Sequence, residues 1–352
     1  MGSYVPTTAA EREEMLAAIG VGSLKELYRS VPQEMLLNGT LNIPEGLSEL
    51  EVREKVTAMA EKNRVYKTVL RGAGAYRHFI PAVVKSVTTR EELVTCYTPY
   101  QAEISQGVLQ GTFEFQTMIC ELTGMDVSNA SHYDGATAAA ETIPMCKDRK
   151  RTKAYVSAAV HPQTIEVMKT YCFASNTELV VVPAKDGKTD MDALREMLGA
   201  DAACFYIQQP SYFGQLEDAK AIGEIVHAAG AKFVMGVNPI ACVILPTPRE
   251  EGADIVVGDG QPLGLDTAFG GPYLGFMATT NAMTRKLPGR IVGQTTDVDG
   301  KTGYVLTLSA REQHIRREKA SSNICSNQAL CAFTAGVYMA AMGEKGMKQC
   351  AR

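Results

Sequence analysis

Short apolar runs alternate with amphipathic stretches along the chain from about residue 153 onward. The runs are rich in β-prone apolar residues and show little alternation of polarity, which is typical of strands buried on both faces of a parallel sheet. We therefore predict strands at 154–160, 178–183, 203–208, 232–237, 254–257 and 273–278.

The amphipathic stretches between several of these runs carry the end signals of helices. One covers 191–198 directly after Asp190, and another covers 218–229 and stops before Gly230, where a glycine is expected at a helix C-terminus. Strands that alternate with helices predict an α/β fold, with a mostly parallel, doubly wound sheet flanked by helices.

The first part of the chain has a different, helical pattern. Thr8 can cap a helix at 9–19, and Ser48 with Glu51 forms a capping box ahead of a second apolar stripe. A cluster of turn-forming residues between 32 and 46 separates the two helices. The sequence therefore predicts a helical N-terminal arm.

These patterns predict three parts. The helical arm covers 1–62, and a large α/β domain covers 63–310. A charged run at 311–319 and an apolar helix at 328–342 follow. Because the chain ends at Arg352, soon after that helix, we expect 311–352 to be only the start of a small C-terminal domain.

Composition and charge exclude several classes of function. The chain has 45% hydrophobic residues and a net charge of -4, so no overall positive field attracts nucleic acid or an anionic membrane. We find no secretory signal and no membrane span. The 9 cysteines form no Cys-x-x-Cys pair and no metal-ligand spacing, which favours reduced thiols in a cytoplasmic protein without a metal.

Two polar segments are candidates for a site. Residues 97–107 bring two tyrosines, two glutamines, a glutamate and two hydroxyl groups around a proline. A solvated loop would explain this composition, but so would a polar wall that orients a small zwitterion such as an amino acid. Residues 129–141 run from a loop into an alanine-rich helix, a pattern that fits either close helix packing or the approach of backbone N–H groups to an anion.

Several long motifs closely resemble the glycine decarboxylase P-protein family (glycine dehydrogenase, decarboxylating). They read TPYQAEISQG at 98–107, FQTMICELTGMDV at 115–127, YDGATAAAE at 133–141 and REKASSNICSNQAL at 317–330. Within that family, the pattern is similar to subunit 1 of the two-subunit form. The resemblance extends over nearly the whole chain.

This resemblance implies a fold-type I architecture like that of pyridoxal 5'-phosphate (PLP) transferases, and it implies partners. In the family, a lysine-bearing subunit 2 holds PLP covalently, and the two chains form an α2β2 heterotetramer. Together they decarboxylate glycine and pass its aminomethyl group to the lipoyl arm of H-protein. PLP takes up the electrons of the broken bond. The resemblance implies no covalent PLP on subunit 1.

The sequence agrees with the lysine-free subunit at two positions. An enzyme of this fold needs a lysine for PLP and an acid that keeps the pyridine nitrogen protonated. Asn238 follows the predicted strand at 232–237, where the acid is expected, and Pro262 stands where the lysine is expected. We therefore predict that this chain contributes no catalytic residue at these positions and is inactive alone.

The resemblance also implies which residues form the wall of the shared site. The family motif places the loop at 98–107 near that site. The substrate-binding candidates are Thr98, Tyr100, Gln101, Glu103 and Gln106. Asn323, in the Asn-Ile-Cys segment, is a candidate cofactor contact.

Two other functions stay open from the sequence. The chain could be a non-catalytic structural partner that only stabilises the active subunit. It could also be a self-sufficient PLP enzyme with a displaced lysine, an alternative that Asn238 and Pro262 argue against.

Overall fold

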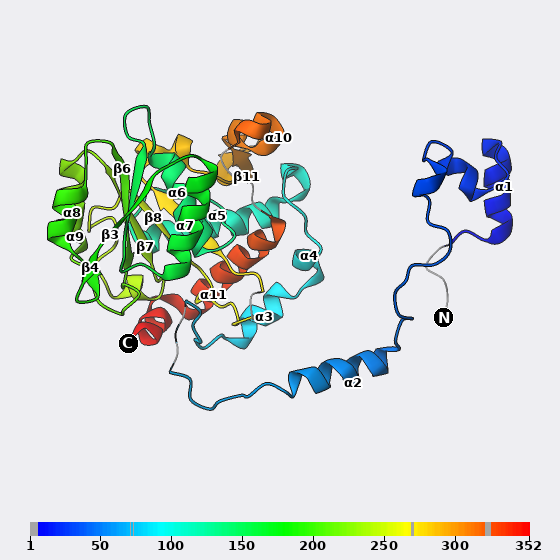
Figure 1. Cartoon of the computed structure of the whole chain (residues 1–352), viewed down its shortest axis with the longest axis horizontal. Helices are drawn as coiled ribbons and strands as arrows, with labels where there is room; N and C mark the ends of the chain where they lie inside the picture. Colours follow the sequence, from blue (N-terminus) through cyan, green and yellow to red (C-terminus); the bar gives the residue numbers. More distant parts are fainter. Residues whose placement is uncertain (1–5, 71, 73, 269–270, 321–324) are drawn as a thin grey trace. The chain divides into compact units, whose positions relative to one another are not determined.

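The computed structural model describes residues 6–70, 72, 74–268, 271–320 and 325–352 (Figure 1). The chain divides into two compact units, Met1–Leu70 and Arg71–Arg352. Each unit is described by itself below.

The first unit is helical, and both of its longer helices begin at the predicted cap residues, each of which forms a capping box. Helix α1 is capped by Thr8 with Glu11, and helix α2 by Ser48 with Glu51. None of its described residues is buried, so its apolar side chains are exposed or half-buried within the unit. Its elements are α1 (Ala9–Ile19), η1 (Leu24–Tyr28), η2 (Gln33–Met35) and α2 (Glu49–Ala60).

The second unit is built on a sheet of 7 strands in the order β1-β9-β8-β7-β6-β2-β3. Neighbours from β8 to β3 are parallel, whereas β9 is antiparallel to both β8 and β1. The strands are β1 (Val127–Ser128), β2 (Lys153–Ser157), β3 (Leu179–Val182), β6 (Ala202–Gln209), β7 (Lys232–Val237), β8 (Ile255–Asp259) and β9 (Gly275–Thr279).

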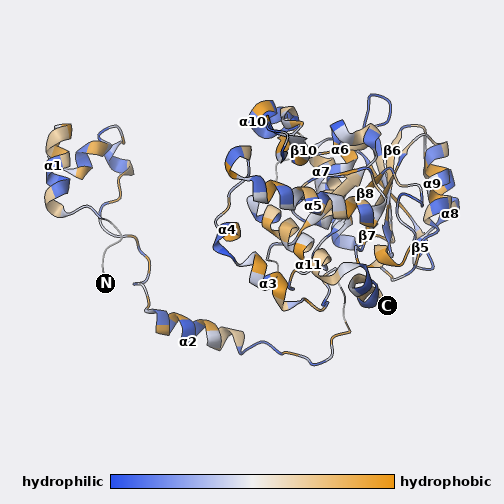
Figure 2. Cartoon of the chain, turned by 180° about the vertical axis from the view of Figure 1, so that it is seen from behind, coloured by the Kyte–Doolittle hydropathy of each residue, from blue (hydrophilic) through white to orange (hydrophobic). Residues whose placement is uncertain are grey.

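Helices cover both faces of this sheet (Figure 1). Helices α5 (Gln106–Thr123), α8 (Met191–Met197), α9 (Ala219–Ala228) and α11 (Ser326–Ala351) contribute to one hydrophobic cluster. Helices α6 (Gly135–Cys146) and α7 (Pro162–Ala174) contribute to the other. Figure 2 shows apolar residues concentrated on the strands and on α11, with polar residues on the outer sides of α8 and α9.

The strands divide their side chains between the two clusters. On β6, Phe205 and Ile207 belong to the first cluster, whereas Cys204 and Tyr206 belong to the second. Successive side chains of a strand point to opposite faces, so a strand with both faces covered is apolar at every position. This explains why the predicted strands are uninterrupted apolar runs.

Smaller elements connect this framework. Two hairpins lie outside the main sheet: β4 (Ala184–Lys185) with β5 (Lys188–Thr189), and β10 (Ile291–Thr296) with β11 (Thr302–Thr307). The remaining helical elements are α3 (Ala82–Thr88), α4 (Glu91–Val94), η3 (Ala102–Ile104), η4 (Ala241–Val243), η5 (Asn281–Lys286), η6 (Ser309–Arg311), α10 (Gln313–Arg316) and η7 (Arg317–Lys319).

The predicted strands are confirmed to within a few residues, and that at 232–237 matches β7 at both ends. The apolar helix predicted at 328–342 is also present, but α11 continues to Ala351 after a kink at Gly343, where φ is 58°. Among the described residues, no helix is long and apolar enough to cross a membrane, and no cluster of side chains could hold a metal ion.

Candidate functional site

A cavity of about 270 Å³ opens at the carboxyl edge of the parallel strands. Gln208, Asn238 and Asp259 line it from the ends of β6, β7 and β8, and Gly135 lines it from the start of α6. Open α/β sheets bind their ligands at this edge, where the strand ends and helix N-termini converge. We call it the sheet-edge cavity.

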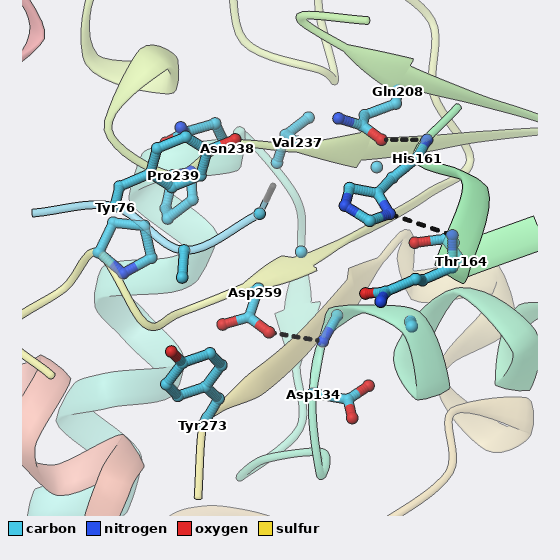
Figure 3. Close-up of a pocket in the computed structure, with 18 of the residues that line it drawn as sticks. Tyr76, Asp134, His161, Thr164, Gln208, Val237, Asn238, Pro239, Asp259 and Tyr273 are labelled. Carbon is cyan, nitrogen blue, oxygen red and sulfur yellow. Dashed lines mark hydrogen bonds between the residues drawn. The ribbon is translucent and has the colours of Figure 1, made fainter. Parts of the chain in front are cut away.

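The N-terminus of α6 faces a negative group, but that group belongs to the chain itself. Asp134 caps the helix by accepting a hydrogen bond from Thr137 N at 2.7 Å. The carboxylate of Asp259 accepts from Gly135 N at 3.1 Å (Figure 3). It also accepts from Gln261 N at 2.8 Å. The anion-binding pattern at 129–141 is therefore occupied here by a side-chain carboxylate.

Burial shifts the titration of this carboxylate. It raises the pKa of Asp259 from 3.8 to about 6; the two backbone donors oppose the shift, and nearby Asp134 adds to it. Because the folded pKa lies above the ordinary value, the native state binds more protons than the unfolded state between about pH 4 and 6. Ionised Asp259 therefore destabilises the fold above about pH 6, and this cost disappears as the pH falls below 4.

Replacement of Asp259 by asparagine should remove that cost, since asparagine keeps the shape of the side chain without its charge. The pKa rise from 3.8 to about 6, at about 1.4 kcal/mol per pKa unit, corresponds to a charge cost of about 3 kcal/mol at pH 7.5. Both carboxylate oxygens accept backbone hydrogen bonds, and the amide nitrogen of asparagine, which replaces one of them, cannot accept, at a cost of about 1 kcal/mol, so we expect Asp259→Asn to raise the free energy of unfolding by about 2 kcal/mol. The gain should shrink toward zero at pH 4.5. Urea unfolding of both proteins at the two pH values measures it, and a gain independent of pH would contradict the buried-charge explanation.

The residues of the sheet-edge cavity do not fit covalent binding of PLP. Asn238 and Pro262 both line the cavity, so the structure brings together the two positions at which the acid and the lysine were expected. The Asn238 side chain is neutral, and its Oδ1 accepts from Ile240 N at 2.9 Å. None of the described residues that line the cavity is a lysine.

Two other lysines of the unit lie at the opposite edge of the sheet. Lys153 begins β2 and pairs with Glu178 at 3.2 Å, and Lys232 begins β7 and pairs with Asp254 at 3.0 Å. The amino ends of parallel strands lie away from the edge at which the cavity opens. Neither lysine is among the described residues that line the sheet-edge cavity.

A second cavity, of about 550 Å³, collects three of the predicted substrate-binding residues. Tyr100 and Gln101 line it from the loop that leads into η3, and Glu103 lines it from η3 itself; all three are exposed. The opposite wall comes from the end of β11 and from the residues that follow it, including Ser309 and His314. We call it the loop cavity.

The other predicted site residues lie elsewhere. The hydroxyl of Thr98 is hydrogen-bonded to that of Ser326 at 2.5 Å. The Gln106 amide donates to Ala102 O and Tyr304 O and accepts from Tyr304 N, which fastens the start of α5 to β11. Neither residue is among the described lining of the loop cavity. Asn323 lies outside the described residues.

The structure also adds residues that sequence reasoning missed. The ring of His314 packs against that of Tyr100, with centroids 5.4 Å apart, and Arg290 donates a hydrogen bond to the Tyr100 hydroxyl at 3.3 Å. Glu312 lies between them, 3.7 Å from Arg290 and 3.8 Å from His314. The charge density at 311–319 was the only sequence signal for part of this group, and nothing in the sequence connected it to Tyr100.

Together, the fold and the sheet-edge cavity define a class. A mostly parallel sheet flanked by helices, with its cavity at the carboxyl edge beside a helix N-terminus, agrees with the fold-type I architecture of PLP-dependent enzymes that the sequence resemblance implies. In this chain Pro262 lines that cavity, and none of the described lining residues is a lysine.

Comparisons with known proteins place the chain within this class. Residues 2–352 match the family described as "Glycine cleavage system P-protein". A relative from Moorella thermoacetica, named probable glycine dehydrogenase (decarboxylating) subunit 1, is 52% identical over 350 residues, which are 99% of this chain and 79% of the relative. A relative of the same name from Carboxydothermus hydrogenoformans is 51% identical with the same coverage. The chain belongs to the glycine cleavage system P-protein family.

Comparison with solved structures supports the same family and fold. An inhibitor-bound glycine decarboxylase (P-protein) of the glycine cleavage system superposes with a TM-score of 0.91 at 43% identity, covering 99% of this chain and 79% of that one. A cysteine desulfurase from Thermococcus onnurineus has a TM-score of 0.51 at 14% identity, over 76% of this chain and 66% of its own, and shows the shared fold alone. The predicted family and fold class are confirmed.

Proposed function

We propose that the chain is the lysine-free subunit of a two-subunit glycine decarboxylase and forms part of an active site whose PLP is bound by the second subunit. The observation that carries this proposal is the contrast between the two cavities. Asn238 and Pro262 line the sheet-edge cavity, at the positions where the sequence predicts an acid and a lysine to be replaced, whereas Tyr100, Gln101 and Glu103 form a polar wall of the loop cavity. The name "subunit 1" of the relatives supports a second subunit.

In this proposal, the chain acts on the substrate and not on the cofactor. PLP, when bound by the partner, supplies a ring that accepts the electrons released by decarboxylation. The loop-cavity wall holds glycine so that the bond between its α-carbon and its carboxylate is correctly oriented, which lowers the entropic part of the activation barrier. The wall also leaves room for the lipoyl arm of H-protein, which receives the aminomethyl group. We propose an α2β2 assembly.

The experiment that tests this function is reconstitution. We expect exchange of the glycine carboxyl group with carbon dioxide to require this chain together with a lysine-bearing P-protein subunit, and either chain alone to be inactive. Borohydride reduction after addition of PLP, followed by mass spectrometry, should label the partner only. A stable label at a single lysine of this chain would show that it is a self-sufficient PLP enzyme.

The second candidate function is that of a purely structural partner, and the hydrogen bonds of two residues in the 98–107 motif favour it. Thr98 and Gln106 are engaged in hydrogen bonds within the chain, so their side chains serve the fold. Tyr100, Gln101 and Glu103 instead expose polar groups on a cavity wall. Substitution of these residues separates the two candidates.

A further inference from the structure

A group of charged side chains underlies one end of the loop cavity. Arg290 precedes β10, Arg311 ends η6, and Glu312 precedes α10. The side chains of Arg290 and Glu312 are only 12% and 10% exposed, and they form an ion pair at 3.7 Å. These groups are mostly withdrawn from water, so their interactions are screened less than those of surface charges.

Arg290 determines how the Tyr100 hydroxyl can bind a ligand. Its Nη2 donates to the phenol oxygen at 3.3 Å, and its Cζ lies 5.5 Å from the ring centroid. A phenol carries one hydrogen and can both donate and accept. Because the guanidinium occupies an acceptor site of the oxygen, the phenol hydrogen is left to donate to another group. Tyr100 is therefore prepared to bind a hydrogen-bond acceptor.

The charge of the group favours an anionic acceptor. Two guanidinium groups, Arg290 and Arg311, face one carboxylate, Glu312, which leaves one net positive charge when His314 is neutral. Among the residues that the structure describes, two donors of this group, Arg290 Nε and Arg311 Nη1, and one acceptor, Glu312 Oε1, are buried without a hydrogen-bond partner, so unpaired donors outnumber unpaired acceptors. The acidic Glu103 on the same cavity is exposed, where solvent screens its charge.

We propose that Arg290, held by Glu312, is a positioning residue that makes Tyr100 a donor for a carboxylate, so that this end of the cavity selects the carboxylate of glycine and not its ammonium group. The inference rests on the proposed function, which it deepens by assigning one end of the substrate to one end of the cavity. The ligand class is a small carboxylate. Arg290 acts on it through Tyr100.

The test uses the complex reconstituted with the lysine-bearing subunit, with acetate and methylammonium as probes for the two ends of glycine. In Arg290→Gln we expect the KM for glycine and the inhibition constant of acetate each to rise about tenfold, with a smaller change in kcat. Inhibition by methylammonium should stay within about twofold. Arg290→Lys keeps the charge but not the planar fork, so its increases should be about threefold.

Two controls separate this role from a structural one. Arg285→Gln removes an exposed arginine on η5 and should change neither the KM for glycine nor the inhibition constant of acetate. Broadening of the acetate methyl resonance, measured by NMR with the assembled complex, reports carboxylate binding without turnover and should decrease in Arg290→Gln. If Arg290→Gln fails to assemble, Arg290→Lys supplies the same comparison.

The outcomes distinguish the inference from the function on which it rests. A wild-type complex without glycine-dependent exchange would refute the proposed function. An active wild-type complex in which Arg290→Gln and Arg290→Lys leave acetate binding unchanged would overturn the inference alone. Loss of methylammonium inhibition with intact acetate inhibition would also overturn it, because it would assign the cation to this end of the cavity.

Discussion

Replacement of Tyr100 by phenylalanine in the reconstituted complex is expected to lower kcat/KM for glycine by about tenfold to 100-fold. The variant loses only the hydroxyl and keeps the ring that packs against His314. A hydrogen bond to a charged group contributes about 1.5–3 kcal/mol, and about 1.4 kcal/mol corresponds to a factor of ten in rate. Initial rates of glycine–carbon dioxide exchange over a range of glycine concentrations measure this effect.

The same loop provides the control. Tyr97 is 77% exposed and is not among the described lining of the loop cavity, so Tyr97→Phe should leave the kinetics unchanged. Gln101→Ala, on the cavity wall, should also lower the rate. Size-exclusion chromatography should show the same association with the partner in all three variants. Unchanged kinetics in both Tyr100→Phe and Gln101→Ala would support the purely structural partner.

Substitution of Gly258 by alanine should lower the free energy of unfolding of the isolated chain by more than about 3 kcal/mol, the upper part of the usual range for overpacking. Gly258 lies on β8, next to the sheet-edge cavity. A Cβ atom there would lie 2.4 Å from Cζ of Phe276 and 2.5 Å from the carbonyl oxygen of Val237. The ring of Phe276 is buried in the core, so it has little room to move away from the new atom. The Val237 oxygen belongs to the backbone of the neighbouring strand β7, so relief of that contact would displace the strand.

A glycine without such neighbours is the matched control. Gly107 lies in α5, and a Cβ there would meet no described atom within 4 Å. Alanine has the higher helix propensity, so Gly107→Ala should raise stability by up to about 1 kcal/mol. Urea unfolding followed by circular dichroism measures both variants. Equal stabilities would show that the strand tolerates a side chain at Gly258, contrary to the packing described.

The strands of the core could be predicted because burial on both faces leaves a clear pattern. Phe205 and Ile207 meet one set of helices, whereas Cys204 and Tyr206 meet the other, so the whole run has to be apolar. Strand direction leaves no such pattern. The run at 273–278 was recognised as a strand, but its antiparallel pairing with β8, and the two-residue strand β1 beside it, came only from the structure.

Part of the candidate site could also be predicted. Polar groups at 97–107 are too dense for a buried segment, and the structure exposes Tyr100, Gln101 and Glu103 on a cavity wall. The polarity of a residue does not reveal its partner, however. Gln106 has the same amide as Gln101, yet it is bound to the backbone of Tyr304, far away in the sequence.

The sequence by itself determined the family and the fold class, because these follow from residue identity and from the local order of apolar and polar positions. Tertiary structure alone decided what surrounds those residues. Only the packed chain brings Arg290 and Glu312 to Tyr100 and places Asp259 at the N-terminus of α6. Hydrogen bonds and charge interactions depend on distances of a few ångströms between residues that are remote along the chain, and folding sets those distances.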